Sequence, residues 1–427
     1  MKKIFTTVLF GIAFGSAQLF SQNVSIAKEA NDFAFNLFAK LNEEHTGENI
    51  AISPFETYST LAMLYVIYDN KATSELEKVL NVETSKEIFT KKIFAANKIV
   101  KDINADFEKM RQEGIAELKN QIKEYLEHEK SGDFDKLLAE NIPIWNLDMP
   151  MHFHAKTILR MSEKLQVDER TKKLISENFG ADFAHVDFTN KANAAAQINK
   201  WIEGNCNFSD EQGFDVSQLI SEATKIAALS YSELTLRWRN PYFGEPNDTE
   251  NADFFLQDGG KISAPMMSSK VSGISLGVME YDNFKITIIP YFGDRLILRI
   301  ILPNENISIK DALTSYQSGV QANTINALAT TSLPRFNIAP KSVRLNDALM
   351  SLGLKNFIRQ EFAEMLQRTE FSVDEIGTSV KSLGATFTTF GLTPDHFSID
   401  RPFVFMIEDT ASGIIWYMGQ IYDPSKN

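Results

Sequence analysis

Residues 375–383 read Glu375-Ile376-Gly377-Thr378-Ser379-Val380-Lys381-Ser382-Leu383, and they open a segment that reaches Pro402 27 positions later. Two apolar stretches typical of strands, residues 403–407 and 414–418, follow this segment directly. A loop of this length without structure of its own is uncommon inside a compact domain and is usually functional. We therefore expect residues 375–401 to form a functional loop.

The rest of the chain places helices first and strands later. Apolar residues recur at helical spacing in residues 27–42, and Ser53-Pro54 supplies a capping residue and a first-turn proline for a second helix. From Ile226 onward the apolar residues approach a period of two, as in strands. Because no βαβ rhythm is present, this order favours an α+β fold built on a mainly antiparallel sheet.

The composition and the N-terminal residues restrict the class of protein and its location. The formal net charge of -13 argues against a nucleic-acid partner, since such a partner requires a basic surface. Residues 1–22 have the charged start, short apolar run and small residues of a signal peptide, and no later stretch reaches the length of a membrane span. We expect a secreted or periplasmic protein, with a buried N-terminal helix as the alternative for this segment.

No catalytic or metal-binding pattern is present in the sequence. His152 and His154 could share one face of a strand, but no cysteine or third histidine lies near them, so a surface or half-buried pair is favoured over a metal site. The chain has no glycine-rich phosphate loop and no Gly-x-Ser-x-Gly elbow. Its only cysteine, Cys206, is expected to be a small side chain at a helix end, with a reactive thiol as the alternative. We expect no cofactor and no metal.

An ordered set of short motifs resembles the serpin family over residues 28–425. No single motif is specific, but the order of the whole set is. The motifs are Asn49-Ile50-Ala51-Ile52-Ser53-Pro54, Ile198-Asn199-Lys200-Trp201, Pro290-Tyr291-Phe292-Gly293, Leu333-Pro334-Arg335-Phe336 and Asp400-Arg401-Pro402-Phe403, together with the hinge at Glu375.

The resemblance implies a single domain with about nine helices, three mainly antiparallel β-sheets and an exposed reactive loop. The alternative is two domains that divide near residue 150. Residues 106–138 are highly charged, carry one apolar stripe and look like an inserted helix relative to the family. We expect this helix to lie on the protein body, with a helix that docks a partner as the alternative.

The resemblance also implies an inhibitor of serine or cysteine proteases rather than an enzyme. In the family, the protease cleaves the exposed loop, the hinge inserts as a new strand of the main sheet, and the acyl-protease is trapped. A monomer is expected. A non-inhibitory serpin that serves as a binding or carrier protein is the alternative, and a hydrolase is a distant third.

The hinge sequence permits such an insertion. Side chains of an inserted strand alternate between the core and the surface. Counting from Thr378, the inward positions include Val380 and Ser382, and every inward side chain is small or β-branched. The outward positions include Ser379, Lys381 and Leu383. The charge of Lys381 therefore falls on the solvent side, where it costs little.

Family spacing places the reactive bond between Gly391 and Leu392. The alternative is the bond between Phe390 and Gly391, because Phe390 offers a protease pocket a large apolar side chain. The absence of Lys and Arg between Lys381 and Arg401 favours an elastase- or chymotrypsin-like protease over a trypsin-like one.

The family resemblance further implies a region where the sheet opens. Glu375 is expected to pair with Arg335 near Trp238, and the other members of this region are Ser53, Glu56, Asn199, Ser230 and Gln367. Three of them depart from the family. Glu56 stands where serpins usually have Ser, Ser230 stands for Asn, and Gln367 stands for His. These departures favour either a rebuilt opening network or a loss of inhibition.

Overall fold

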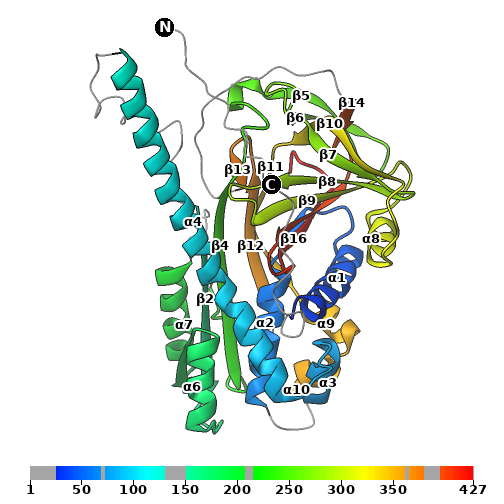
Figure 1. Cartoon of the computed structure of the whole chain (residues 1–427). Coiled ribbons are helices and arrows are strands. Elements are labelled where there is room, and N and C mark those ends of the chain that lie inside the picture. Colours follow the sequence, from blue (N-terminus) through cyan, green and yellow to red (C-terminus); the bar gives the residue numbers. More distant parts are fainter. Residues whose placement is uncertain are drawn as a thin grey trace.

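A computed structural model describes residues 26–68, 73–129, 151–206, 215–360, 365–378 and 395–426. The expected signal peptide 1–22 and residues 379–394 lie outside these ranges. The fold is α+β, as the sequence predicted, with helices packed on two sheets (Figure 1). The helices of the described part are α1 (Ala27–Glu44), α2 (Pro54–Ile67), α3 (Thr73–Val79), α4 (Lys86–Glu129), α6 (Glu169–Asn178), α7 (Lys191–Asn205), α8 (Ile309–Gln317), α9 (Asn346–Leu352), α10 (Lys355–Gln360) and the 3-10 turn η1 (Pro246–Asp248).

A six-stranded sheet has the order β11-β12-β13-β4-β2-β3. Its strands are β2 (His152–Ser162), β3 (Ala181–Val186), β4 (Ile226–Arg237), β11 (Phe336–Arg344), β12 (Leu366–Val373) and β13 (Gly377–Thr378). Strands β2 and β4 pair antiparallel along nearly their whole length, from His152 opposite Thr235 to Met161 opposite Ile226. The short β13 sits in the middle of this sheet, so the two halves of the sheet meet at the hinge.

The other strands form a ten-stranded sheet with the order β1-β16-β15-β9-β8-β7-β10-β6-β5, and β14 pairs with β10. They are β1 (Ile50–Ile52), β5 (Glu250–Phe255), β6 (Lys261–Ser268), β7 (Leu276–Glu280), β8 (Phe284–Pro290), β9 (Leu296–Pro303), β10 (Thr324–Pro334), β14 (Asp395–Ser398), β15 (Phe403–Asp409) and β16 (Ile415–Ile421). Within the described residues this is one sheet where two were expected, because β10 pairs with β7 along its first half and with β6 along its second half.

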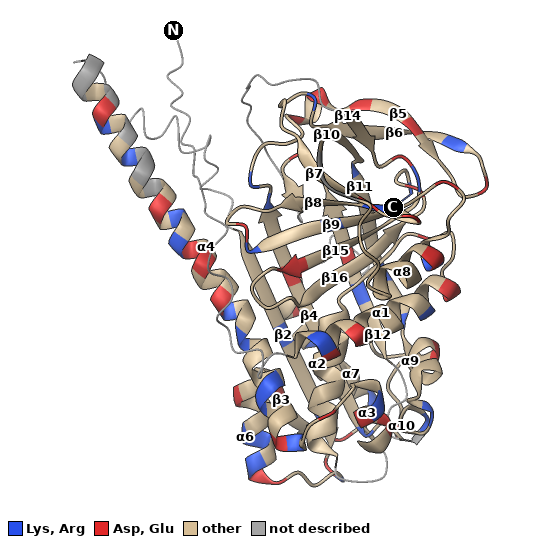
Figure 2. Ribbon diagram, turned by 45° about the vertical axis from the view of Figure 1, so that its right-hand side comes forward, with Lys and Arg blue, Asp and Glu red and all other residues tan. Residues whose placement is uncertain are grey.

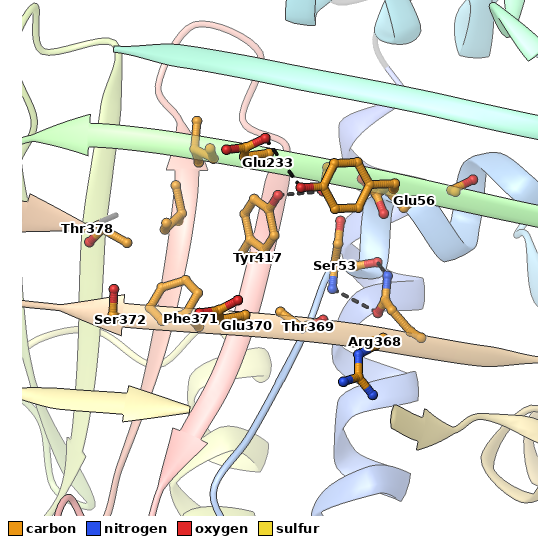
Figure 3. A pocket seen from close by; sticks show the side chains of 16 residues that line it. Ser53, Glu56, Glu233, Arg368, Thr369, Glu370, Phe371, Ser372, Thr378 and Tyr417 are labelled. Atoms are coloured by element: carbon orange, nitrogen blue, oxygen red, sulfur yellow. Dashed lines mark hydrogen bonds between the residues drawn. The ribbon is translucent and has the colours of Figure 1, made fainter. Parts of the chain in front are cut away.

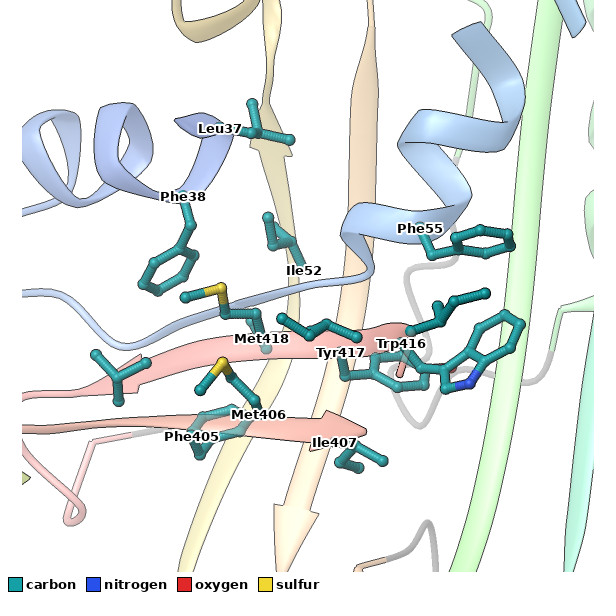
Figure 4. Close-up of a cluster of buried hydrophobic side chains, with 14 of the residues drawn as sticks. Leu37, Phe38, Ile52, Phe55, Phe405, Met406, Ile407, Trp416, Tyr417 and Met418 are labelled. Carbon is teal, nitrogen blue, oxygen red and sulfur yellow. The ribbon is translucent and has the colours of Figure 1, made fainter. Parts of the chain in front are cut away.

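The core unites residues from both sides of position 150, which excludes the two-domain alternative. Helix α2 packs against β16 and β4, and its Phe55 meets Trp416 edge-to-face at a ring-centroid distance of 4.7 Å. Trp416 in turn meets Phe153 of β2 at 4.8 Å. Figure 4 shows how the side chains of α1, α2, β15 and β16 fill the same space. A main core shared by residues from both sides of position 150 is typical of a single domain, and a second, smaller cluster lies around α7.

The charged helix expected over residues 106–138 is part of a longer helix. Helix α4 begins at Lys86 and continues without a break to Glu129, so its 44 residues span about 66 Å. Residues 130–138 lie outside the described ranges. Asp106 holds α4 to the body through Arg295, which also pairs with Asp409 of β15 at 3.1 Å. Figure 2 shows basic and acidic residues interspersed along α4 as it extends away from the sheets.

In the ranges given above, no helix combines the length and the apolar character that a membrane span requires.

Candidate functional site

The hinge already occupies the top of a strand position between β12 and β4. Thr378 is opposite Val373 of β12 on one side and Leu236 of β4 on the other, and Gly377 is opposite Arg237. Both pairings are antiparallel, so β4 and β12 run parallel to each other with β13 between them. Residues Ser379, Val380, Lys381, Ser382 and Leu383 of the predicted hinge lie outside the described residues.

Close backbone approach explains why the hinge has glycine at position 377. A Cβ atom built on Gly377 would lie 2.1 Å from the carbonyl oxygen of Leu236, well inside van der Waals contact. The next residue, Thr378, is buried, and its hydroxyl shares a hydrogen bond with the hydroxyl of Tyr291. Tyr291 stacks on Trp238, with ring centroids 4.8 Å apart and planes 7° from parallel.

The predicted ion pair between Glu375 and Arg335 is present. The side chain of Glu375 is 1% exposed, that of Arg335 is 38% exposed, and Arg335 Nε donates to the carboxylate at 3.1 Å. The hydroxyl of Thr249 also donates to Glu375. A buried carboxylate needs such partners, because water is not available to solvate it.

A tight turn at Asp374 connects this pair to Trp238. The carboxylate of Asp374 accepts hydrogen bonds from the backbone N–H groups of Ile376 at 2.8 Å and Gly377 at 3.1 Å. Its carbonyl accepts from the indole Nε1 of Trp238 at 2.9 Å. Burial raises the pKa of Asp374 above its usual value. The hydrogen bond from Trp238 therefore anchors the turn that precedes the hinge strand β13, and the sequence analysis had placed Trp238 near this pair.

Below Thr378 the sheet has a gap. Within the described residues, β4 makes no ladder pair with β12, and each of the two strands pairs with β13. A cavity of about 50 Å³ lies between them. It is lined by residues 230–234 of β4, residues 367–372 of β12, and Ser53, Glu56, Thr378, Ile407 and Tyr417 (Figure 3).

Four of the predicted sheet-opening residues meet at this cavity, namely Ser53, Glu56, Ser230 and Gln367. Gln367 exchanges two hydrogen bonds of 2.9 Å with the backbone N–H and C=O of Ser53. Ser53 occupies the N-cap position of α2, but its hydroxyl makes no capping hydrogen bond, contrary to expectation. Ser230 bonds Thr60 of α2 at 2.9 Å. Helix α2 is thus fixed to both β12 and β4.

Glu56 is the only acid in the first turn of α2, and its half-buried side chain lines this cavity. Burial raises its pKa to about 7. Its Oε1 atom has no hydrogen-bond partner. The hydroxyl of Tyr417 shares a hydrogen bond with Ser232, and burial together with the Glu56 charge raises the pKa of Tyr417.

Asn199 does not belong to this cluster. It lies on α7, where its amide donates to Asp215 and its carbonyl oxygen accepts from Val216 N–H at 3.0 Å. It therefore ties α7 to the segment that precedes β4. The predicted reactive-bond residues Phe390, Gly391 and Leu392 lie outside the described residues.

The other candidate groups show no catalytic arrangement. The rings of His152 and His154 lie 4.8 Å apart on β2, and in the described ranges no cluster of His, Cys, Asp and Glu suits a metal ion. Cys206 follows α7 at its C-cap, and burial and the Glu56 charge raise its pKa to about 11. A thiol with a raised pKa is a weak nucleophile, which favours the structural interpretation of Cys206.

Sequence reasoning missed several residues of the site. Thr249 and Ser232 gave no signal of their own, because each reaches the site over a long sequence separation. Tyr291 was recognised only as part of a family motif, and its hydrogen bond to Thr378 was not predicted. Asp374 could have been found. An Asp side chain often forms a turn by accepting hydrogen bonds from the backbone N–H groups two and three residues later. Here the residue three positions later is Gly377, which suits a tight turn.

Comparison with known proteins agrees with this geometry. A sequence model of the family Serpin (serine protease inhibitor) matches residues 28–424. The human leukocyte elastase inhibitor is 24% identical and covers 92% of this chain and 97% of its own. Bovine plasminogen activator inhibitor 1 is 23% identical over 99% of this chain and its own full length. An uncharacterized serpin-like protein of Methanosarcina mazei is 24% identical, with coverages of 94% and 88%.

Solved structures show the same fold. The thermophilic serpin tengpin in its native state has a TM-score of 0.67 at 18% identity and covers 96% of both chains. Cleaved Serpin 42Da has a TM-score of 0.66 at 18% identity, with coverages of 93% and 98%. The complex of thyroxine-binding globulin with thyroxine has a TM-score of 0.66 at 16% identity, with coverages of 93% and 99%. The chain belongs to the serpin family.

Proposed function

We propose that this protein inhibits a serine or cysteine protease by adding its cleaved loop to the six-stranded sheet. One observation carries the proposal. Gly377 and Thr378 of the hinge are already paired between β4 and β12, and the gap below them is bounded by two parallel strands. A strand that continues from Thr378 would run antiparallel to both neighbours, which is the strand-addition mode of recognition.

The side chains that line the gap support this proposal. Continuing the register of β13 brings Val380 opposite Leu234 and Phe371, both of which are buried. The same register brings Ser382 opposite Ser232 and Thr369. Apolar residues would therefore meet apolar ones and hydroxyls would meet hydroxyls on the inner face. No inward position of the loop adds a charge to the core.

The proposed target is an elastase- or chymotrypsin-like protease outside the cytoplasm. The signal-peptide pattern of residues 1–22 supports export, and the reactive bond is proposed between Gly391 and Leu392 or between Phe390 and Gly391. No cofactor is proposed, and a monomer suffices because the hinge and the gap belong to one chain.

A protease panel tests the proposal. The protein is incubated with elastase-, chymotrypsin- and trypsin-like enzymes, and the released C-terminal fragment is weighed by mass spectrometry. A fragment that starts at residue 391 or 392, together with a complex that survives SDS, supports inhibition at the proposed bond. Cleavage confined to positions outside 389–393 overturns the placement, and cleavage without any stable complex overturns inhibition.

The second candidate is a non-inhibitory serpin that binds or carries a ligand. Two observations favour it. Glu56 places a carboxyl at the cavity where the family usually has a small Ser, and a solved structure of the same fold is a complex of thyroxine-binding globulin with thyroxine. A carrier would be cleaved in its loop without trapping the protease, so the same panel separates the two functions.

A further inference from the structure

The outer half of helix α4 carries a buried side chain that lies outside both hydrophobic clusters. Phe107 is the last residue of α4 in the main core, and Met110 packs against that core. Ile122 lies about 18 Å beyond Met110 along the helix axis. It is only 5% exposed, yet among the described residues it belongs to neither cluster. Because Figures 1 and 2 show this half of α4 extending away from the sheets, the body of the protein does not explain the burial of Ile122.

The same half of α4 depends on a tertiary contact to stay helical. Most helical stability in proteins comes from the packing of an apolar face and not from intrinsic propensity. Gly114 weakens the helix further, by about 1 kcal/mol relative to Ala. Leu126, one turn beyond Ile122, is half-buried, and the apolar stripe of the sequence continues to this residue. The contact that stabilises the outer half therefore lies along this stripe.

The connectivity of the chain places residues 130–150 beside this half of the helix. The side chain of Asn104 exchanges hydrogen bonds of 2.6 and 2.8 Å with the backbone C=O and N–H of Phe153, just after the described chain resumes at Met151. From Asn104 to Glu129 the helix rises about 37 Å. The 21 residues that connect Glu129 to Met151 must cover this distance in the opposite direction. Fully extended they would reach about 75 Å, so their length leaves room for a compact path along α4.

The sequence of residues 130–150 has an apolar side that matches the stripe on α4. Ser131-Gly132-Asp133 is a pattern typical of a turn, and Pro143 ends the helical spacing that follows it. The apolar residues between them recur at steps of three and four, and they are Phe134, Leu137, Leu138 and Ile142. Two antiparallel stretches joined by a short turn, each with one apolar side, bury those sides against each other.

We propose that residues 130–150 fold back on α4 and cover the apolar stripe around Ile122 and Leu126. Helix α4 and this segment then form an arm that is closed by its own chain. The arm presents its charged side to solvent and offers no apolar docking face to another protein. The segment is favoured over a second copy as the occupant, because connectivity keeps it beside α4 at a high effective concentration. The inference does not depend on the proposed inhibitory function.

Hydrogen exchange of the full chain, read by mass spectrometry of peptides from residues 110–129, tests this contact. In the natural chain the amides of residues 115–126 are expected to exchange slowly, since a covered helix does not fray. Leu138→Asp places an unpaired charge in the apolar contact and is expected to accelerate this exchange by about tenfold or more. Ala139→Asp is the matched control, because it adds the same charge about 100° around a helix from Leu138, and it should change the rate by less than about twofold.

The amides of β15 report the fold of the body, and they should keep their protection in both variants. If Leu138→Asp does not fold, Leu138→Ala removes the apolar contact without adding a charge and should accelerate the exchange of residues 115–126 by a smaller factor. Equal exchange in the Leu138 variants and in Ala139→Asp overturns the inference. Fast exchange of residues 115–126 in the natural chain also overturns it, because the stripe is then open to another protein. Protection that is lost on dilution overturns it as well and assigns the stripe to a second copy.

Discussion

At the scale of single residues, Glu375 illustrates how the hinge is held. Its carboxylate is almost fully buried, and the donors that solvate it are Arg335 and Thr249. Arg335 is partly exposed, so it also connects the buried charge to solvent. Removing such a partner is more costly than removing a surface ion pair, because the remaining charge stays buried.

Arg335→Met is therefore expected to lower the free energy of unfolding by about 3 kcal/mol, the low end for a broken buried pair, since Arg335 is 38% exposed. The measurement is chemical denaturation followed by circular dichroism. Lys261→Met is the matched control, because Lys261 and Asp253 form an ion pair that is 61% and 52% exposed. The control should lose about 0.5 kcal/mol or less. Equal losses in the two variants would contradict the role given to Glu375.

Gly377 is the second residue that decides the position of the hinge. Gly377→Ala would place a methyl group against the backbone of Leu236, which cannot move without disturbing β4. The hinge is expected to leave the sheet at a cost of about 1–3 kcal/mol. Hydrogen exchange of the Thr378 amide should accelerate. Gly204→Ala on α7 is the control, because a Cβ there meets no atom within 4 Å, and unchanged exchange in Gly377→Ala would refute the steric argument.

At the scale of elements, the periodicity of apolar residues predicted those helices and strands that depend mainly on local sequence. The helix at 27–42 and the C-terminal strands were predicted from their periodicity, and α1 and β15 lie there. The pair of Glu375 and Arg335 came from the family resemblance, since 40 residues separate them. The contact of Ser232 with Tyr417, which spans 185 residues, could not be predicted, because neither hydroxyl carries a sequence signal of its partner.

Helix α4 shows the same limit of prediction from local sequence. Its charged second half attracted attention, yet the helix begins 20 residues earlier at Lys86 rather than at Asp106. The earlier part packs its apolar side, including Phe89 and Ile93, on the protein body, so its stability comes from tertiary contact. A charge pattern alone marks the solvated part of a helix and not its start.

The register of the six-stranded sheet yields a prediction for Lys381. Continuing the pairing of β13 would bring Lys381 between Glu233 of β4 and Glu370 of β12 on the outer face. Cross-strand pairs of opposite charge contribute about 0.2–1 kcal/mol each, and like charges reverse the sign. Lys381→Glu is expected to reduce the gain in melting temperature on loop cleavage. Glu370→Lys in the same chain should restore most of it. An undiminished gain in Lys381→Glu would mean that the added strand takes another register.

At the scale of the whole molecule, the hinge joins two half-sheets that otherwise touch through the core. Strands β2, β3 and β4 lie on one side of the gap, and β11 and β12 lie on the other. Helix α2 spans the gap from beneath, with bonds from Gln367 to Ser53 and from Ser230 to Thr60. Opening of the sheet must therefore break contacts of α2 and not only contacts between strands.

Loop cleavage should consequently change the stability of the entire chain. If the cleaved loop adds to the sheet, it fills the cavity, pairs with β4 and β12 and joins the two half-sheets along their length. A gain of only about 4 kcal/mol would raise the melting temperature by roughly 10 °C on the scale that holds for domains of moderate size. Differential scanning calorimetry before and after cleavage at residues 389–393 measures this gain.

A carrier-type loop would be cut without entering the sheet, and the melting temperature of the protein would not change. The comparison is internally controlled, because the cleaved and uncleaved proteins share every residue and differ in one peptide bond. An unchanged melting temperature, together with the absence of an SDS-stable complex, would therefore exclude the inhibitory mechanism and leave the carrier function.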